Sequence, residues 1–321
     1  MVVYMNPANS TFMLEVKNLN KKFGDVHAVK NLNFQVKKGE VFGFLGPNGA
    51  GKTTTMRVVT CYIPATSGSV CVDGLDTVEQ SLEVRKRIGY LPENNPLYND
   101  MTVTEYLNFV GEVRGIKGQK LASRIDQLFN ECGLIKMENR QIGKLSKGYR
   151  QRTGLAQAMM HNPDLLILDE PMSGLDPNQI IEIRHLIKKI GEEKTVIYCS
   201  HILSEVSATC NRILIINEGA IVASGTPDEL TQRSTKGNRY LLRVKGDRTS
   251  IQQKLMSVEG VSNVSMHDHA AGWLAADVLS SRNDDIGEKL FRCAADSGWS
   301  LAELRHEGAS LEDVFTQLTR G

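Results

Sequence analysis

The residues best suited to chemistry lie in one stretch, Gly46–Thr54, which reads GPNGAGKTT. It fits the phosphate-loop pattern G-x-x-x-x-G-K-[ST], with Gly46, Gly51, Lys52 and Thr53 at the fixed positions. Glycines let backbone N–H groups approach phosphate oxygens, because no Cβ atom stands in the way. The lysine supplies a positive charge for the terminal phosphates, and the threonine hydroxyl is of the kind that reaches Mg²⁺. The pattern therefore predicts that the chain binds a nucleoside triphosphate.

The segments on either side of this loop support the same interpretation. Before it, Val41–Leu45 is a short apolar run that predicts a buried strand, and after it, Lys52–Thr60 lacks Gly and Pro and predicts a helix. The free N–H groups and positive dipole end of that helix would face the same anion. A Gly-rich turn without a ligand is the alternative, but the order of strand, loop and helix favours a nucleotide site. The candidate nucleotide-contacting residues of the loop are Gly46, Pro47, Asn48, Gly49, Ala50, Gly51, Lys52, Thr53 and Thr54.

Two carboxylates follow a second strand. Leu165–Leu168 is a continuous apolar run, typical of a central strand buried on both faces, and Asp169 and Glu170 come directly after it. Ligand chemistry in α/β folds gathers at the C-terminal ends of such strands. Asp169 can hold Mg²⁺, directly or through water, and Glu170 can polarise an attacking water as a general base. Acidic residues that merely end a strand are the alternative, and the upstream phosphate loop makes it the less favoured one.

Two further side chains have open interpretations at this point. His201 follows the apolar run Thr195–Ser200, and that strand is expected beside the Asp169 strand, so His201 could contact a terminal phosphate. A lone histidine at a strand end is more often structural. Phe23 precedes a turn upstream of the loop, where its ring could stack on the nucleotide base or simply be an apolar residue at a strand edge.

Composition bounds the class of protein. A chain of 321 residues suggests two domains, and 41% hydrophobic with 23% charged residues is ordinary for a globular protein. A net charge of +1 gives no reason to expect a nucleic-acid partner. The sequence lacks a long apolar run that would span a bilayer, and its start, MVVYMNPANSTF, does not predict a secretory signal. Scattered cysteines without a Cys-x-x-Cys pair argue for reduced thiols in the cytosol and against a zinc site.

A helical block interrupts an α/β pattern. Strands are predicted at Met13–Lys17, Leu32–Val36, Ser69–Asp73, Arg212–Asn217 and Ala220–Ser224, and helices at Ser81–Ile88, Thr102–Val113, Leu121–Cys132, Thr153–Met160 and Ile180–Ile190. The segment 89–96 is rich in Gly and Pro and predicts a loop that carries Glu93. Almost all of 99–162 predicts helix, with Thr102 and Glu105 at capping-box spacing. Such a block usually forms a separate subdomain.

Within that block lies the sequence LSKGYRQR, which starts at Leu145. Ser146 followed by Gly148 at the opening of a helix makes a second potential anion-binding helix N-terminus. Many helices start in this way, so the signal is weak by itself. Further along, Asp176 lies inside the turn PMSGLDP, which precedes a predicted helix.

The remainder of the chain, from about Lys236 to Gly321, predicts a second unit. Its elements are a strand at Tyr240–Val244, a helix at Thr249–Ser257, strands at Val261–Met266 and Trp273–Val278, a helix at Asp284–Asp296, a strand at Trp299–Leu304 and a last helix at Leu311–Leu318 that starts from Ser310-x-x-Asp313. The order β-α-β-β-α-β suggests a small ferredoxin-like sandwich. It contains no catalytic grouping, so an accessory, dimer-contacting or regulatory role is expected.

Taken together, the motifs from about Met13 to Arg233 resemble the ATP-binding cassette of ABC transporters, and especially cassettes with exporter-type permeases of the gliding-motility, sodium-export and multidrug groups. The specific feature is the order: an aromatic residue, GPNGAGKTT, the loop with Glu93, LSKGYRQR, LLILDEP, SGLDP and a histidine at a strand end. The resemblance implies these roles: Phe23 for adenine stacking, Gly46–Thr54 as Walker A, Asp169 as Walker B, Glu170 as catalytic carboxylate, Ser146, Lys147 and Gly148 in the signature motif, Asp176 in the D-loop and His201 as switch histidine.

The sequence departs from the family pattern at two places. The usual signature LSGGQ is LSKGY, with Lys147 for a Gly and Tyr149 for the Gln. Ser146 and Gly148 remain, so phosphate contact through a hydroxyl and the backbone is still expected, and Lys147 would add favourable charge. Glu93 stands where a Gln is usual. A carboxylate can ligate Mg²⁺ but adds negative charge near the phosphates, so Glu93 is a candidate Mg²⁺ ligand or a relay to a partner.

The fold class expected from these observations is α/β, a P-loop NTPase fold of the ABC-cassette type with a helical subdomain at about 95–162. A small α+β C-terminal domain is expected in addition, with limits at 13–233 and 236–321. The resemblance also implies that ATP and Mg²⁺ bind between two cassettes packed head to tail. With one phosphate loop per chain, this means a homodimer, attached to a separate integral-membrane permease on the cytoplasmic face of the cell membrane.

Two other functions are alternatives to that of a transporter ATPase. A soluble ATP-driven dimerisation switch, as in cassette proteins that act on ribosomes or DNA, typically has two cassettes in one chain or a long coiled coil, which this sequence lacks. A cassette that binds ATP without turnover is disfavoured because Lys52, Asp169, Glu170 and His201 are all present. The cassette does not reveal the transported substrate.

Overall fold

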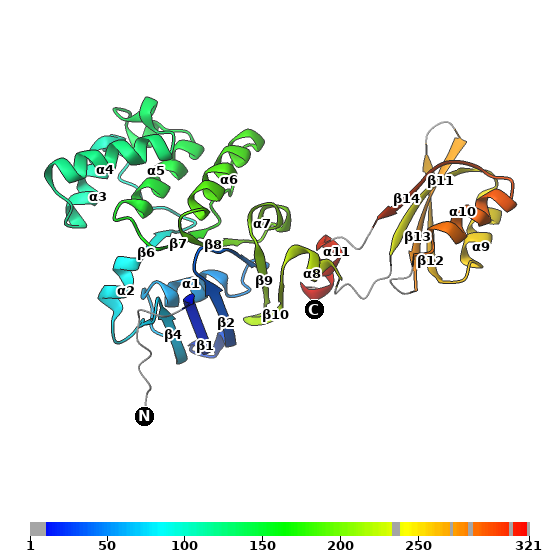
Figure 1. The fold of residues 1–321 in the computed structure, drawn as a ribbon, viewed down its shortest axis with the longest axis horizontal. Coiled ribbons are helices and arrows are strands. Elements are labelled where there is room, and N and C mark those ends of the chain that lie inside the picture. Colours follow the sequence, from blue (N-terminus) through cyan, green and yellow to red (C-terminus); the bar gives the residue numbers. More distant parts are fainter. Residues whose placement is uncertain (1–10, 233–237, 270–271, 282–284, 308–310, 320–321) are drawn as a thin grey trace. The chain divides into compact units, whose positions relative to one another are not determined.

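The chain builds two compact units, residues 1–226 and 227–321, and each is described by itself (Figure 1). The computed structural model describes residues 11–232, 238–269, 272–281, 285–307 and 311–319. The predicted domain limits at Arg233 and Lys236 lie outside the described residues and stay a prediction.

A six-stranded sheet in the order β10-β9-β3-β8-β7-β6 forms the centre of the first unit. Its strands are β3 (Val41–Leu45), β6 (Ile88–Leu91), β7 (Leu165–Asp169), β8 (Thr195–Ser200), β9 (Arg212–Asn217) and β10 (Ala220–Gly225). Strands β6, β7, β8, β3 and β9 run parallel, and every residue of β3, β7 and β8 is buried. Continuous apolar runs suit strands covered on both faces. Because parallel strands end at one edge of the sheet, Leu45, Asp169 and Ser200 come close together there.

Several elements of this unit differ from the sequence prediction. The helix expected to reach Ile88 ends at Arg87 as α2 (Ser81–Arg87), and the segment expected to be a loop begins with β6. Residues of β6 pair with β7, and a Cβ atom on Gly89 would lie 2.3 Å from the Ala158 carbonyl oxygen. Pairing with the buried strand therefore overrides the breaker-rich local sequence. A short helix after His201, α7 (Leu203–Thr209), was not predicted.

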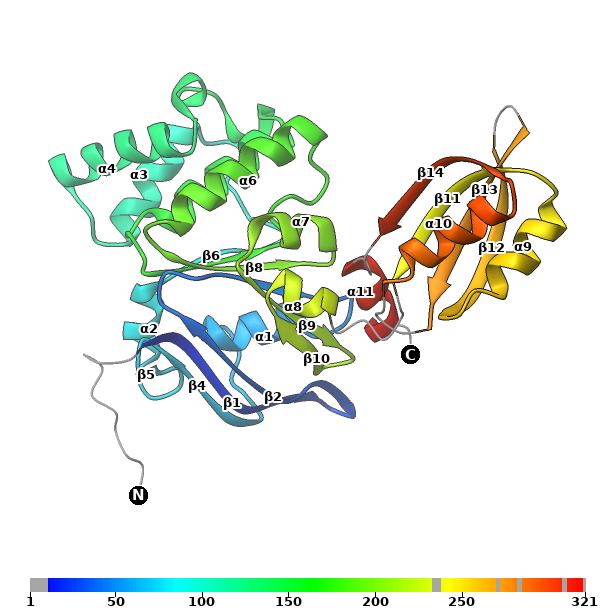
Figure 2. The same ribbon diagram turned by 45° about the vertical axis from the view of Figure 1, so that its right-hand side comes forward.

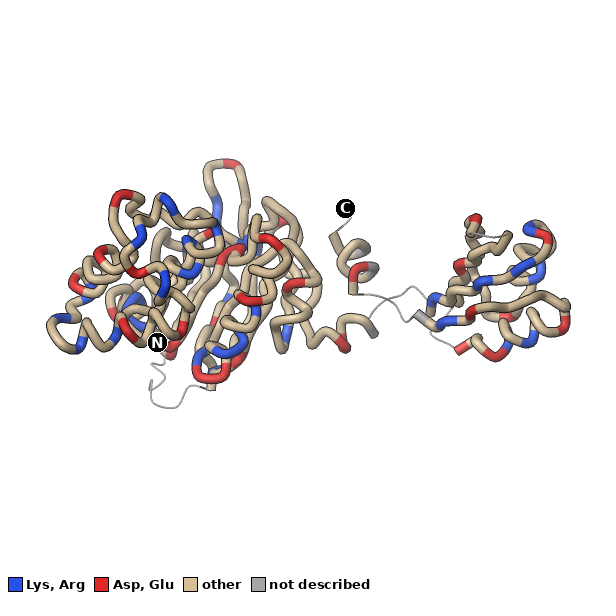
Figure 3. The backbone as a smooth tube through the Cα atoms, turned by 90° about the horizontal axis from the view of Figure 1, so that it is seen from above, with Lys and Arg blue, Asp and Glu red and all other residues tan. Residues whose placement is uncertain are grey.

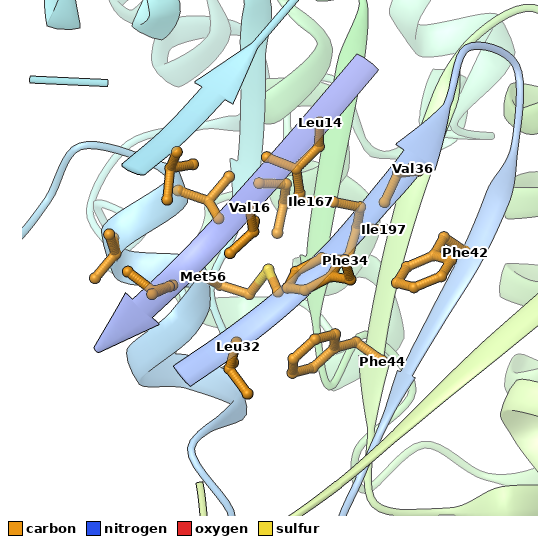
Figure 4. Packing of buried hydrophobic residues seen from close by; sticks show 14 of the residues in the cluster. Leu14, Val16, Leu32, Phe34, Val36, Phe42, Phe44, Met56, Ile167 and Ile197 are labelled. Atoms are coloured by element: carbon orange, nitrogen blue, oxygen red, sulfur yellow. The ribbon is translucent and has the colours of Figure 1, made fainter. Parts of the chain in front are cut away.

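An antiparallel sheet in the order β2-β1-β4-β5 covers the phosphate-loop helix. Its strands are β1 (Phe12–Phe23), β2 (Val26–Lys37), β4 (Ser67–Val72) and β5 (Leu75–Asp76), and the helix is α1 (Lys52–Val59). Side chains from both sheets and from α1 form one buried core, in which the Phe34 ring packs against Phe42 and Phe44 with centroids 6.0 and 5.5 Å apart (Figure 4). This core holds α1 against the sheet and so fixes the position of the loop.

The predicted helical block contains α3 (Val103–Val113), α4 (Gly118–Glu131) and α5 (Lys147–Met159), which lie together in both ribbon views (Figures 1 and 2). The capping box predicted at the start of α3 is present, because Glu105 N donates to Thr102 Oγ1 and Thr102 N donates to Glu105 Oε2. Helix α6 (Pro177–Gly191) returns the chain to β8. Arg152 of the signature segment donates to the Cys132 carbonyl and pairs with Glu182 on α6. This arginine joins α4, α5 and α6.

The second unit has the predicted β-α-β-β-α-β order. Its elements are β11 (Arg239–Lys245), α9 (Arg248–Met256), β12 (Val261–His269), β13 (Trp273–Ser280), α10 (Gly287–Asp296) and β14 (Ser300–Glu307). The antiparallel sheet order β12-β13-β11-β14 is that of a ferredoxin-like sandwich, and its core includes Tyr240, Leu255 and Leu290. Helices α8 (Pro227–Gln232) and α11 (Leu311–Thr319) belong to the same unit and contact each other. Ser310, the expected start of α11, lies outside the described residues.

Positive and negative residues are interspersed along the described parts of both units, as the tube in Figure 3 shows. This distribution agrees with a net charge of +1 and offers no single-sign stripe for a polyanion in those parts. Among the described residues, no helix has the length and apolar character needed to cross a membrane.

The aromatic contact between the two sheets predicts the outcome of a truncation. Phe34→Ala removes a ring that is only 9% exposed, so we expect the first unit to lose about 3–5 kcal/mol of unfolding free energy. Urea unfolding followed by circular dichroism measures this loss. Phe23→Ala is the matched control, because that ring is 49% exposed, and its unfolding midpoint should stay close to that of the unaltered chain. Equal midpoints for the two variants would contradict the assignment of Phe34 to the core.

Candidate nucleotide-binding and hydrolysis site

The phosphate loop is closely surrounded by backbone, and its glycines are required for this reason. Gly51 has φ +102°, and a Cβ atom there would lie 2.6 Å from the Ala28 carbonyl oxygen on β2. A Cβ atom on Gly46 would lie 2.4 Å from the Ile216 carbonyl oxygen on β9. The loop is therefore held closely between β2 of the antiparallel sheet and β9 of the six-stranded sheet.

Helix α1 begins directly after Gly51 with its first N–H groups uncapped. Gly51 makes no side-chain cap, and the first turn contains no acidic residue. These N–H groups border a cavity of about 290 Å³, lined by Ala28, Asn48, Gly49, Gly51, Lys52, Thr53, Thr54, Glu93 and Glu170. Free N–H groups and the positive helix end favour an anion in this position.

Lys52 supplies a buried cation at the base of the cavity. Its ammonium donates to the carbonyls of Gly46 at 2.7 Å and Pro47 at 3.3 Å, and it lies 3.5 Å from Glu170 Oε1. Lys52 is 6% exposed and Glu170 is 7% exposed, so both charges are largely removed from water. Buried charges persist when they are paired and hydrogen-bonded, as these are.

Thr53 and Asp169 form an oxygen-rich pair beside this cation. Thr53 Oγ1 donates to Asp169 Oδ2 at 2.9 Å, whereas no hydrogen bond of good geometry reaches the buried Oδ1 from the described residues. Burial raises the pKa of the Asp169 carboxyl, with the nearby Glu170 and Glu93 charges adding to the rise and the Thr53 hydrogen bond and Lys52 opposing it. Tyr90 on β6 is close by, and burial together with the Asp169 charge raises its pKa.

These oxygens fit Mg²⁺. The orphaned Asp169 Oδ1 and the Thr53 hydroxyl are the hard ligands that this ion prefers. The described residues contain no cluster of three or more His, Cys, Asp and Glu side chains able to hold a metal alone. Such a sparse set agrees with Mg²⁺, which commonly keeps waters and is completed by substrate phosphates.

The Glu170 carboxylate lies beside the C-terminal end of β8. It has φ +50°, a left-handed conformation that is unfavourable for a residue with a side chain, and its N–H donates to the Cys199 carbonyl at 2.9 Å. Glu170 Oε1 lies 3.0 Å from His201 Nδ1, and Oε2 accepts a hydrogen bond from Ser200 at 3.1 Å. The structure thus brings the predicted residues Lys52, Glu170 and His201 together.

The signature and D-loop residues lie next to each other, away from this cavity. Ser146 caps α5 by accepting from Tyr149 N, and Asp176 caps α6 by accepting from Gln179 N at 2.9 Å. The Lys147 ammonium occupies the space where a Cβ atom on Gly174 would lie. The described residues that line the phosphate-loop cavity do not include Ser146, Lys147, Gly148 or Asp176.

Glu93 and Phe23 have different surroundings. Glu93 is exposed and lines the phosphate-loop cavity together with Thr53 and Glu170. Phe23 at the end of β1 is 49% exposed, with the Lys21 ammonium 5.0 Å from its ring centroid, and the residues that line the cavity do not include it.

Sequence reasoning missed several polar residues around the site. Ser200 and Glu205 are buried, and Ser200 donates within hydrogen-bond distance of both Glu170 and Glu205. The one available signal for Ser200 was a hydroxyl at the end of an apolar run, directly before His201. Glu205 lies on the unpredicted helix α7, so its position had no signal at all.

A parallel sheet with a glycine-rich loop, a buried lysine and strand-end carboxylates defines the class of P-loop nucleotide-binding proteins. Comparisons with known proteins specify the family. Residues 29–173 match the family described as ABC transporter. The chain is 32% identical to the linearmycin resistance ATP-binding protein LnrL of Bacillus subtilis over 308 residues, 96% of this chain and 98% of that protein. It is 37% identical to the ABC transporter ATP-binding protein NatA of Bacillus subtilis, over 68% of this chain and 91% of that protein.

A solved structure gives the same result. The chain matches a dimeric ATP-binding cassette in a post-hydrolysis state with ADP and Pi, with a TM-score of 0.61 and 27% identity over 67% of this chain and 98% of that chain. The chain therefore belongs to the ATP-binding proteins of ABC transporters, and it is an ABC-type ATPase.

The surroundings of the loop glycines predict different effects of the same substitution. In Gly51→Ala the new Cβ atom meets the Ala28 carbonyl and the backbone has an unfavourable φ, so we expect a loss of ATP binding of at least tenfold. Gly49→Ala is the matched control, because Gly49 also has a positive φ but no atom within 4 Å of its Cβ position. Titration with a fluorescent ATP analogue measures both affinities. Equal losses would show that the contact with β2 does not shape the loop.

Proposed function

We propose that the chain hydrolyses ATP in a composite site formed by two copies of itself, and that this turnover drives a separate membrane-embedded permease. The observation that carries the proposal is the separation of the two phosphate-contacting motifs. Lys52 and the α1 N-terminus border one cavity, whereas Ser146 and the α5 N-terminus lie elsewhere on the same unit. A site that uses both motifs needs a second copy of the chain.

Within one copy, the phosphate loop and Lys52 hold the triphosphate. The backbone N–H groups of residues 46–54 cradle its oxygens, and the Lys52 ammonium neutralises the terminal phosphates. Phe23 stacks on adenine. Thr53 and Asp169, with Glu93 at the cavity wall, would hold Mg²⁺, which when bound supplies positive charge that lowers the cost of bringing phosphate oxygens together.

Hydrolysis is the attack of a water oxygen on the terminal phosphorus, with cleavage of the bond to ADP. Glu170 is the general base that accepts the proton from this water, and the products are ADP and phosphate. Its Oε1 faces Lys52 and His201, both of which carry donors suited to the transferred phosphate. His201 contacts the terminal phosphate and holds Glu170 in place.

The second copy closes the site with its signature segment. The positive N-terminal end of α5, the Ser146 hydroxyl and the Lys147 ammonium supply donors to the exposed side of the phosphates. Asp176 belongs to the loop at the start of α6, adjacent to that segment. Because ATP contacts both copies only in the closed state, its binding favours the dimer, and loss of the terminal phosphate releases it. The dimeric ADP-bound and Pi-bound cassette among the similar structures supports this arrangement.

A groove in the first unit fits the permease partner. Residues from α2, β6 and α3, together with Tyr62 after α1, line a cavity of about 620 Å³. Several of its apolar residues are widely exposed, among them Tyr62 at 75%, Leu82 at 66% and Val113 at 70%, and the basic residues Arg85, Lys86 and Arg114 also line it. Clustered exposed apolar side chains mark interaction surfaces. The relatives include a bacitracin transport ATP-binding protein of Bacillus licheniformis and a Nod factor export ATP-binding protein of Cupriavidus metallidurans, which support a transporter partner and an export direction. A permease partner implies attachment of the chain at the cytoplasmic face of the membrane. These relatives favour this role over a soluble dimerisation switch.

Removal of the general base separates binding from turnover. In Glu170→Gln we expect hydrolysis to fall at least a hundredfold, because an amide cannot accept the proton, while ATP binding persists and the dimer accumulates. Colorimetric phosphate release and light scattering with ATP measure the two effects. Glu288→Gln is the matched control, since that exposed carboxylate lies on α10 of the second unit, where it pairs with Arg292. Turnover that is unchanged in Glu170→Gln would reject the general-base role.

The groove predicts a separation of partner binding from catalysis. Val113→Asp puts a charge among its apolar residues, so we expect the polytopic membrane protein that co-purifies with the unaltered chain to be lost. The ATPase rate of the isolated chain should stay within about twofold. Val78→Asp is the matched control, because Val78 is 71% exposed and does not line the groove. Affinity purification from solubilised native membranes tests both variants, and retention of the partner by Val113→Asp would remove the groove from the proposal.

A further inference from the structure

A buried chain of hydrogen bonds leads from the protein core to Glu170. Tyr198 Oη donates to Glu205 Oε2 at 2.9 Å, and Ser200 Oγ lies 3.1 Å from both Glu205 Oε2 and Glu170 Oε2. Relative exposures are 0% for Tyr198 and Ser200, 6% for Glu205 and 7% for Glu170. The function of Glu170 proposed above does not explain why a second carboxylate is buried behind it.

The network contains fewer hydrogens than its acceptors require. A serine hydroxyl has one hydrogen to donate, so Ser200 can serve Glu170 or Glu205 but not both at once. The Ile202 N–H donates to Ser200 Oγ at 3.1 Å and so restricts the directions left for that hydrogen. Tyr198 is a second donor to Glu205. Because Tyr198 serves Glu205, the Ser200 hydrogen is left for Glu170.

Burial of Glu205 is costly and needs these donors. A carboxylate removed from water is tolerated only when it is hydrogen-bonded or paired with a cation. Glu205 lies in the first turn of α7, where the helix N-terminus also favours a negative charge. If the Tyr198 hydroxyl were absent, Glu205 would compete for the Ser200 hydrogen.

The bond from Ser200 divides the two oxygens of Glu170 between different tasks. Oε2 is anchored from the core side, whereas the buried Oε1 accepts no hydrogen bond of good geometry among the described residues and faces Lys52 and His201. A free lone pair on Oε1 is the acceptor that a water in the cavity would use. The left-handed backbone of Glu170, at φ +50°, needs such an anchor because it is not a preferred conformation.

We infer that Ser200 is a positioning residue for hydrolysis, and that the Tyr198–Glu205 pair determines which carboxylate receives its hydrogen. Ser200 holds Glu170 with Oε1 toward the water. Tyr198 satisfies Glu205 and so keeps it from taking the Ser200 hydrogen. The inference rests on the proposed role of Glu170 as general base.

The first experiment measures kcat and KM for ATP on the full-length chain. Ser200→Ala frees Glu170 Oε2, so we expect kcat to fall about tenfold, a part of the effect of a general base, while KM stays within about twofold. Ser207→Ala is the matched control, because that hydroxyl lies on α7 and bonds to the Ser204 carbonyl. A similar fall in kcat in both variants would overturn the inference. So would an unchanged kcat in Ser200→Ala with a raised KM.

A double-mutant cycle tests whether Ser200 acts through Glu170. In a Glu170→Gln background we expect Ser200→Ala to cause no further decrease in single-turnover hydrolysis, because the positioned group is already gone. A general structural defect would lower both backgrounds by the same factor, and that result would overturn the inference. Full activity of Glu170→Gln itself would instead reject the proposed general base, so the two failures are distinguishable.

A third experiment asks whether a second substitution restores kcat, and it does not require the Ser200→Ala variant to fold. Tyr198→Phe removes one oxygen atom, after which Glu205 takes the Ser200 hydrogen, and kcat should fall about as far as in Ser200→Ala. In Tyr198→Phe with Glu205→Gln, the amide donates to Ser200 and turns its hydrogen toward Glu170, so most of kcat should return. The proposed role of the Tyr198–Glu205 pair would be overturned if kcat were unchanged in Tyr198→Phe. It would also be overturned if kcat did not recover in the double variant.

Discussion

The buried ion pair between Lys52 and Glu170 is the interaction on which the rest of the site depends. Lys52 Nζ lies 3.5 Å from Glu170 Oε1, and both side chains are largely buried. Buried charges of this kind need hydrogen bonds beside the pairing, and here loop carbonyls accept from Lys52 while Ser200 donates to Glu170 Oε2. The parallel sheet makes this possible, because β3, β7 and β8 end at the same edge and deliver the lysine, the carboxylates and the serine together.

The same geometry explains why one copy of the chain offers only part of a site. The cavity presents donors from α1 and Lys52 on one side, while the second set of donors lies at the start of α5. The terminal phosphate of a nucleotide held by one copy would therefore remain open to solvent. In the proposed composite site, dependence on a second copy would join ATP binding to association of the two chains. The Lys147 ammonium lies beside Gly174, so the signature residues and the turn that carries Asp176 are neighbours.

Much of the site could be predicted from the sequence, because its motifs are local. GPNGAGKTT sets the loop, a continuous apolar run sets β7, and the acidic pair follows that strand directly, so Lys52, Thr53, Asp169 and Glu170 were all within reach of pattern and spacing. The second unit was also predictable, since the boundaries of its elements follow clear apolar periods and its strand order is that of a ferredoxin-like sandwich. The misses were β6 and α7, where short segments acquire their structure from pairing and packing with distant parts of the chain.

The sequence by itself determined the candidate chemistry: a phosphate loop, candidate Mg²⁺ ligands and a candidate general base, because each of these depends on residue types at fixed spacing. Only the tertiary structure decided how those residues are held. It placed Ser200 between two carboxylates, buried Tyr198 and Glu205 behind Glu170, and left the signature segment outside the phosphate-loop cavity. The physical reason is that hydrogen bonds and burial join residues far apart in the chain, and no local pattern encodes which distant group will satisfy a buried charge.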